Sequence, residues 1–217
     1  MLPFPHLIQY GNTVQTALMD INFNNSSIGS TTVTDAAGHV FTKVGTGAAS
    51  VVNDATKGNV MQFSGSSYFT IPMVSNISLS NLHFKMRLVF KSTVSSENMV
   101  FSTGDYYSAG SIVGGILLTL FNATGTQLFC TDSAGTFTRC QFSYTVNTWR
   151  DLTIEWVPTT KTMIIHDNDS NTNVFSGTVP TGFGNGTQFA IGASYVRGAG
   201  NANFQGQIQR IRIEAVL

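Results

Sequence analysis

Residues 82–91 read LHFKMRLVFK, and the almost perfect alternation of apolar and polar side chains in this stretch decides the fold class. The apolar residues share one face: Leu82, Phe84, Met86, Leu88 and Phe90. The polar residues share the other: His83, Lys85, Arg87 and Lys91. A period of two predicts a β-strand that is buried on one side only. We expect its basic side chains to face solvent and to discourage edge pairing.

A second stretch repeats this pattern. Residues 151–157, DLTIEWV, place Leu152, Ile154 and Trp156 on one face. Both strands need a second sheet over their apolar face, so the pattern predicts two packed sheets. Residues 114–146 contain apolar runs broken by polar turn sequences, as in an antiparallel meander, and residues 161–179 are typical of a hairpin.

The remaining apolar stretches also predict strands. Residues 59–72, NVMQFSGSSYFTIP, have two apolar runs around Ser-Gly-Ser-Ser and predict another hairpin. In residues 204–216, Ile208 is out of step with the later isoleucines, so we expect a β-bulge near Gln209 and Arg210. With no amphipathic helix in view, the sequence predicts an all-β fold, a two-sheet antiparallel β-sandwich.

The charge and hydropathy of the sequence limit the kinds of partner that the protein can bind. The chain has 217 residues, of which only 10% are charged, and its formal net charge is zero. Because the basic residues form no run, we expect no nucleic-acid binding. Residues 111–121 form the longest apolar stretch, which is too short for a membrane-spanning helix. The start, MLPFPHLIQYGNTV, lacks the features of a secretory signal, so we expect an N-terminal arm over residues 1–18 and one domain over residues 19–217.

Residues 34–72 carry a resemblance to a known family. They resemble the first half of laminin-G-like domains in the concanavalin A-like lectin and glucanase superfamily. The matching features are an Asp-x-x-Gly turn, a glycine, an apolar-x-Phe-x-Gly turn and a Tyr-containing strand that ends in Ile-Pro. They correspond here to Asp35, Gly38, Gly58, Met61, Phe63, Gly65, Tyr68, Ile71 and Pro72.

The resemblance extends over residues 19–217. It includes Trp149 at the entry to a strand, and residues 189–213 resemble the family's Ile-Gly turn, variable loop, Phe-x-Gly and terminal strand. It implies a jelly-roll sandwich, a fold that carries lectins, glycosidases, adhesion modules and structural domains. On the scaffold, we expect Phe63 and Ile71 to be core residues and Gly65 to need a positive φ.

Catalytic signals are missing. The hydrolases of the resembled superfamily share a Glu-x-Asp-x-x-Glu strand, which does not occur here, and Glu97, Glu155 and Glu214 are far apart in sequence. A glycosidase needs two carboxylates across the scissile bond. We interpret Glu155 as part of a solvated outer face and predict that the protein is not an enzyme.

Metal and thiol signals are weak. Residues 166–171, HDNDSN, offer oxygen ligands for calcium, but a turn in which Asp167 binds its own backbone explains them as well. The histidines have no ligand spacing, and we expect no cofactor. Cys130 and Cys140 are placed to form a disulfide across a hairpin, but reduced thiols are the preferred interpretation for a chain without a secretory signal.

Two loops are candidates for ligand contact. Residues 103–110, TGDYYSAG, and residues 192–201, GASYVRGAGN, combine aromatic rings with hydroxyl and amide groups. Aromatic faces stack on sugars and also recur at protein interfaces. The predicted ligand-binding residues are Tyr106, Tyr107, Tyr195 and Arg197. The alternative is that these are ordinary half-buried loop tyrosines.

These observations lead to two hypotheses. In the first, the protein is a structural or adhesion subunit whose arm docks on a protein partner or on other copies in a homo-oligomer. By looser analogy it resembles bacteriophage virion components, such as capsid decoration or tail receptor-binding proteins, and it is then expected in the virion, where it can also bind cell-surface glycans. In the second, it is a secreted, stand-alone carbohydrate-binding module, with calcium dependence left open.

Overall fold

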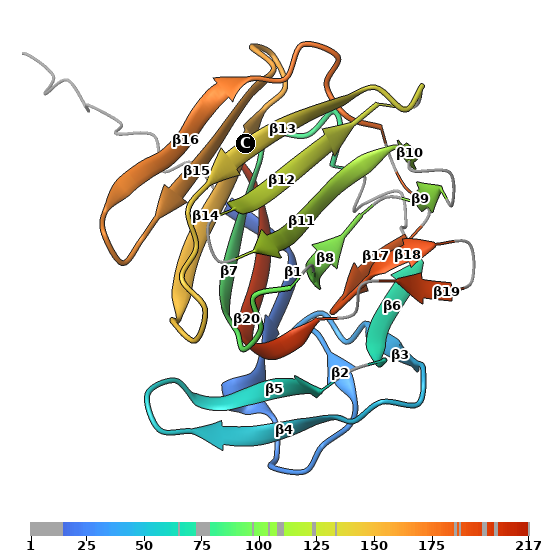
Figure 1. The fold of residues 1–217 in the computed structure, drawn as a ribbon, viewed down its shortest axis with the longest axis vertical. Coiled ribbons are helices and arrows are strands. Elements are labelled where there is room, and N and C mark those ends of the chain that lie inside the picture. Colours follow the sequence, from blue (N-terminus) through green and yellow to red (C-terminus); the bar gives the residue numbers. More distant parts are fainter. Residues whose placement is uncertain are drawn as a thin grey trace, which may run out of the picture.

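Two antiparallel sheets pack face to face in the computed structural model of the protein (Figure 1). The structure describes residues 15–64, 66–72, 79–96, 98–103, 105–107, 111–122, 125–132, 134–184, 186, 188–196, 199–201 and 204–216. Most of the expected arm and Gly65 therefore lie outside the described residues. This architecture confirms the predicted two-sheet β-sandwich.

The first sheet follows the order β16, β15, β14, β7, β20, β5 and β4, and β1 also pairs with β20. The strands are β1 (Gln15–Asn22), β4 (Ala49–Asp54), β5 (Gly58–Ser64), β7 (Phe84–Ser92), β14 (Arg150–Val157), β15 (Thr162–Asp167), β16 (Thr172–Thr178) and β20 (Gln205–Val216). The β4–β5 hairpin projects at the bottom of Figure 1. β1 begins at Gln15, inside the stretch expected as the arm.

The second sheet follows the order β13, β12, β11, β8, β17, β6, β3 and β2. Its strands are β2 (Val33–Thr34), β3 (Val40–Val44), β6 (Tyr68–Pro72), β8 (Asn98–Ser102), β11 (Gly115–Asn122), β12 (Gly125–Thr131), β13 (Phe137–Phe142) and β17 (Gln188–Ile191). A smaller sheet joins β9 (Asp105–Tyr107), β10 (Ser111–Val113), β18 (Ser194–Val196) and β19 (Ala199–Asn201). The helical structure in the described ranges is one short 3-10 helix, η1 (Phe23–Asn25). No helix among the described residues is long and apolar enough to cross a membrane.

Period-two patterning builds the core between the two large sheets. Phe84, Met86, Leu88 and Phe90 of β7 are fully buried, as are the predicted inward residues of β14. Each buried side chain of this size contributes roughly 1.5–3 kcal/mol relative to exposure. The meander over β11, β12 and β13 and the β15–β16 hairpin are also confirmed.

The predicted hairpin over residues 59–72 is wrong. Its two runs form β5, which pairs in the first sheet, and β6, which pairs in the second. Phe63 of β5 and Phe69 of β6 instead meet across the core, with ring centroids 6.0 Å apart. The pattern misled because two strands that face each other across a core alternate in the same way as two strands paired in one sheet.

The C-terminal strand confirms a finer prediction. In β20 the register shifts between Ile208 and Arg210, where the bulge was expected. Ile208, Ile211 and Ile213 are consequently all buried. The prediction that the basic residues of 82–91 discourage edge pairing is wrong, because β7 lies between β14 and β20 in the middle of the sheet.

Two glycines of the C-terminal motif are explained by close approach. A Cβ atom on Gly192, which has φ of +87°, would lie 2.6 Å from the Phe63 ring. A Cβ atom on Gly206 would lie 2.2 Å from the backbone oxygen of Lys91. Phe204, between these glycines, packs its ring 5.8 Å from that of Phe63. The glycines therefore let the chain at Gly192 pack against Phe63, and strand β20 at Gly206 pack against Lys91 and Phe204.

The two cysteines lie in the second sheet with their side chains in the core. Cys130 of β12 and Cys140 of β13 are free and fully buried, on neighbouring strands and offset by two residues. Hydrogen bonding with Cys140, together with burial, raises the pKa of the Cys130 thiol well above its ordinary value. The two thiols are not bonded to each other in the structure, and the preference for reduced cysteines stays a prediction.

Candidate functional site

The outer face of the first sheet carries a polar pocket of about 700 Å³. It lies across five strands: β20, β7, β14, β15 and β16. Strand register places most of its lining side chains in two rows. One row runs through Glu214, Lys85, Glu155 and Ile164, and the other through Arg212, Arg87, Thr153, His166 and Asn173. This surface is called the first-sheet pocket below.

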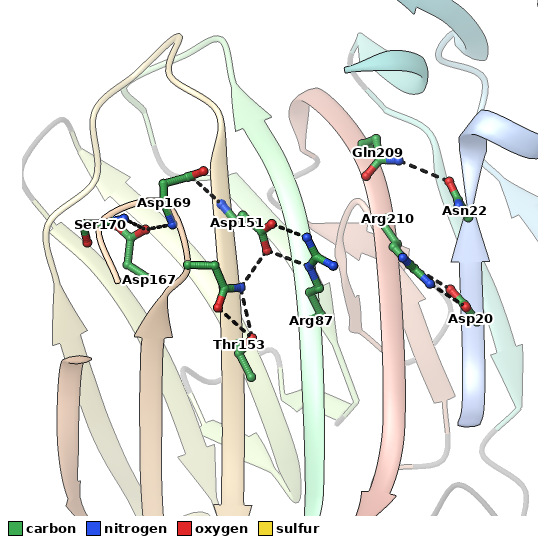
Figure 2. Close-up of polar contacts among 11 residues, drawn as sticks. Asp20, Asn22, Arg87, Asp151, Thr153, Asp167, Asp169, Ser170, Gln209 and Arg210 are labelled. Carbon is green, nitrogen blue, oxygen red and sulfur yellow. Dashed lines mark hydrogen bonds and ion pairs between the residues drawn. The ribbon is translucent and has the colours of Figure 1, made fainter. Parts of the chain in front are cut away.

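Arg87 is held in the pocket by a bidentate contact with Asp151 (Figure 2). Its Nε donates to Oδ1 at 2.9 Å and its Nη2 donates to Oδ2 at 2.5 Å. Asn168 Nδ2 also donates to Oδ1 of Asp151, at 2.8 Å. Burial opposes ionisation of Asp151, but these hydrogen bonds outweigh it and hold the pKa of Asp151 below its ordinary value. Arg87 therefore keeps one orientation beside a charged carboxylate.

The other basic residues of β7 are also matched by acids. Lys85 Nζ lies 3.7 Å from Glu155 Oε2, and Lys91 Nζ lies 2.8 Å from Asp54 Oδ2. Burial opposes ionisation of Asp54, but hydrogen bonds from Lys91 and Thr56 outweigh it and lower the pKa of Asp54. The basic face predicted from the sequence is therefore part of a neutralised ion-pair array.

The two glutamates of the pocket, Glu155 and Glu214, are 59 residues apart in sequence but lie on either side of Lys85 in the sheet. Glu155 Oε1 lies 2.9 Å from His83 Nε2, and Glu214 pairs with the guanidinium of Arg212. Both glutamates are therefore held by basic side chains, Glu155 by His83 and Lys85 and Glu214 by Arg212.

The pocket also contains hydrogen-bonding groups with fixed directions. His166 Nδ1 and Asn173 Oδ1 are 2.9 Å apart, and Thr153 Oγ1 exchanges hydrogen bonds with the side-chain amide of Asn168. Among the described residues that line the pocket, none is Phe, Tyr or Trp. Matched charges and oriented polar groups fit a neutral ligand rich in hydroxyls, because each hydroxyl both donates and accepts.

The HDNDSN segment forms a turn. Asp167 Oδ1 accepts hydrogen bonds from the backbone N–H groups of Asp169 and Ser170, at 2.9 and 3.2 Å (Figure 2). Its Oδ2 accepts from Arg150 Nη1 at 2.7 Å. The turn predicted around Asp167 is confirmed, and its carboxylate oxygens are used within the protein. In the described ranges, His, Cys, Asp and Glu side chains form no group of three or more suited to a metal ion.

The predicted tyrosines come together at the level of the backbone. Tyr106 and Tyr107 lie in β9, Tyr195 lies in β18, and these strands are neighbours in the small sheet, with Tyr195 opposite Asp105. Arg197 lies outside the described residues. The two loops chosen from the sequence are therefore adjacent, and their role in ligand contact stays a prediction.

Sequence reasoning missed the first-sheet pocket because its residues come from five separate strands. The alternation in residues 82–91 and 151–157 did identify polar faces that include Lys85, Arg87 and Glu155. What it lacked was the register that places Glu214 and His166 beside them. The sequence contains one signal for the pocket: several predicted strands have a polar face, and such faces line up across a sheet when the strands pair.

Neither a protein-family model nor a curated protein sequence matches this chain. Solved structures match it in fold. Domain 4 of AbnA, a GH43 extracellular arabinanase from Geobacillus stearothermophilus, solved in complex with arabinotriose, has a TM-score of 0.67 and 18% identity, over 94% of this chain and 95% of that one. The chain shares the fold of this domain.

Two further structures agree with that assignment. The CBM40 of Ruminococcus gnavus IT-sialidase, bound to α2,3-sialyllactose, has a TM-score of 0.56 and 13% identity, over 71% of this chain and 88% of that one. A structure of botulinum neurotoxin type C, whose cell entry depends on two ganglioside molecules, has a TM-score of 0.65 and 11% identity over 91% of this chain. This chain spans 47% of the length of the toxin chain.

Proposed function

We propose that this protein is a non-catalytic, saccharide-binding β-sandwich that holds a glycan in the first-sheet pocket. The observation that carries the proposal is the pocket itself, in which neutralised charges fix polar groups across five strands. A saccharide presents hydroxyls at close intervals, and charged or amide side chains of fixed orientation bind such hydroxyls at low entropic cost.

The solved neighbours support this proposal. The arabinanase domain was solved with arabinotriose and the CBM40 with sialyllactose, and the neurotoxin interacts with gangliosides during cell entry. The fold is thus one on which saccharide sites recur. A catalytic role has less support, because Glu155 is paired with Lys85 and Glu214 with Arg212.

The tyrosine strands are the second candidate surface for the same function. Tyr106, Tyr107 and Tyr195 would supply the aromatic stacking that the described lining of the pocket lacks. Arg197 belongs to the same prediction. Binding that survives loss of the pocket residues but not Tyr106→Ala with Tyr107→Ala would move the site to these strands.

The biological setting proposed for this module is that of a structural or adhesion subunit, as in a bacteriophage virion, assembled through the N-terminal residues. Deletion of residues 1–14 spares β1, which begins at Gln15. Light scattering of the full and shortened chains tests this directly. A closed oligomer that requires residues 1–14 supports the subunit, and a monomer in both cases favours a stand-alone module.

The saccharide proposal is tested on a glycan array with a matched set of variants. His166→Ala with Asn173→Ala removes polar groups from the pocket, and Asn53→Ala removes an exposed amide from β4, away from the pocket lining. We expect the array signal to fall at least about ten-fold for the pocket variant, as loss of two hydrogen bonds predicts, and to persist in the control. Equal signals for both variants would contradict the pocket as the site.

A further inference from the structure

The second sheet ends in a strand with an unusual outer face. β13 pairs with β12 and is the terminal strand of its sheet. Cys140 of β13 is buried in the core, whereas Phe137, Arg139 and Gln141 are exposed. In register with these three residues, β12 presents Thr131, Phe129 and Gln127. Phe129, Phe137, Arg139, Gln127 and Gln141 are called the β13 patch below.

Arg139 is the unusual member of this patch. Its guanidinium carbon lies 4.9 Å from the centroid of Phe137 and 5.6 Å from that of Phe129. The two rings meet edge to face with centroids 5.8 Å apart. Two aromatic contacts restrict the rotamers of a long side chain, so part of the entropic cost of binding is met before a ligand arrives.

Arg139 differs from the other described arginines in lacking a described carboxylate partner for its guanidinium. Each of the others contacts a carboxylate: Arg87 with Asp151, Arg150 with Asp167, Arg210 with Asp20 and Arg212 with Glu214. Arg139 makes no such contact with any residue that the structure describes. A guanidinium presents a planar fork of N–H groups that matches a carboxylate with two parallel hydrogen bonds.

The surroundings of Arg139 narrow the ligand class. Phe137 is 44% exposed, which leaves an apolar ring face beside the cation. Gln141, two residues along the strand, and Gln127, opposite it, add amide groups that bind hydroxyls. Alternate residues along a strand are about 6.6 Å apart, so these groups surround Arg139 within a short span. The Arg139 guanidinium is a single cation flanked by the amides of Gln127 and Gln141. This arrangement matches a ligand with one carboxylate and several hydroxyls better than it matches a peptide with a run of acidic side chains.

We propose that the β13 patch is a second binding site, specific for a saccharide that carries a carboxylate, such as a uronic-acid unit. Arg139 binds the carboxylate, Phe137 covers a C–H face of the sugar ring, and Gln127 and Gln141 bind its hydroxyls. The inference rests on the proposed function and extends it, because the first-sheet pocket, with its charges already paired, takes neutral saccharides.

The test is an NMR titration of the full chain with trigalacturonate and with its methyl ester, which keeps the shape and removes the charge. We expect the Nε–H signal of Arg139 to shift with the acid, and the ester to bind at least about ten-fold more weakly, as loss of a charge-assisted contact predicts. Arg139→Ala should abolish the acid-specific binding. Lys43→Ala is the matched control, because it removes the same charge from β3, near the other end of the sheet.

Results that contradict the β13 site can be distinguished from results that contradict the proposed function. Equal binding of acid and ester, or acid binding that shifts the first-sheet pocket and leaves Arg139 unchanged, would overturn the β13 site. If a polyglutamate peptide shifts Arg139 and trigalacturonate does not, the patch is a peptide site and the saccharide assignment is wrong. Arabinotriose added in parallel distinguishes the two proposals: binding of this neutral sugar alone leaves the proposed function standing, and no binding of either sugar counts against both.

Discussion

The two large sheets present outer faces of opposite chemistry. On the first sheet, β7, β14 and β20 carry closely matched charges, such as Arg87 with Asp151 and Arg210 with Asp20. On the second sheet, Arg139 is the one charged residue in the sequences of β8, β11, β12 and β13. Instead, Met99, Leu117 and Phe129 form an apolar cluster there, separate from the main core.

The same period-two alternation of apolar and polar residues thus produces two different kinds of outer surface. Both sheets bury every second residue against the same core, so their stability has a common source. Cross-strand pairing then decides what the outward residues do. On the first sheet it neutralises charges and fixes a polar pocket, and on the second it places one unmatched arginine on aromatic rings.

The largest expected effect comes from the core that the two faces share. Gly192→Ala forces a side chain into φ of +87° and against the Phe63 ring, and should lower the free energy of unfolding by about 3 kcal/mol. Gly182→Ala is the control, because Gly182 has φ of +67° and no atom within 4 Å of an added Cβ. Urea unfolding should give only about 1 kcal/mol for the control, from backbone strain alone. Equal losses would contradict the packing of this turn on Phe63.

A smaller effect is expected from the charged face. Arg87→Ala leaves Asp151, whose side chain is 10% exposed, without two charged hydrogen bonds, and should cost about 2 kcal/mol at pH 7. The pKa of Asp151 is lowered in the folded state, so its contribution is present above the ordinary Asp pKa of about 4 and is lost as the pH falls through the lowered value.

The unfolding free energies of wild type and Arg87→Ala should therefore converge in acid. Urea titrations at pH 7 and at about pH 3 measure this convergence. Adding Asp151→Asn to Arg87→Ala should recover part of the loss at pH 7, because no buried charge is then left without its partner. A difference that does not change with pH would argue against the ion pair as its cause.

The smallest effect is expected from the second face. Arg139→Ala removes cation–π contacts with Phe129 and Phe137, and should change the free energy of unfolding by no more than about 1 kcal/mol. Because no described carboxylate pairs with Arg139, the change should not depend on pH between 7 and about 3. A loss as large as that of Arg87→Ala would make the two faces energetically equivalent and contradict the difference between them.

Much of the fold could be predicted because burial leaves a local imprint on the sequence. The inward residues of β7 and β14, and the bulge in β20, follow from period-two alternation and one break in it. The turn that separates β5 from β6 could not be assigned, because a turn within a sheet and a turn between sheets have the same local chemistry.

The candidate site was predictable only in fragments. The polar faces of residues 82–91 and 151–157 were visible, but the pocket depends on the pairing of β20 with β7 and of β7 with β14, over long sequence separations. Likewise, nothing local distinguishes Arg139 from Arg87. The difference between them is whether the fold brings a carboxylate within reach.

Amide chemical-shift mapping with the best neutral glycan from the array shows whether the first-sheet pocket binds a saccharide. If the saccharide binds there, we expect saturable shifts in β7, β14 and β15, around Arg87, Thr153 and His166, which disappear in His166→Ala with Asn173→Ala. Shifts confined to β9 and β18, or no shifts in the first sheet at saturating glycan, would contradict binding in this pocket.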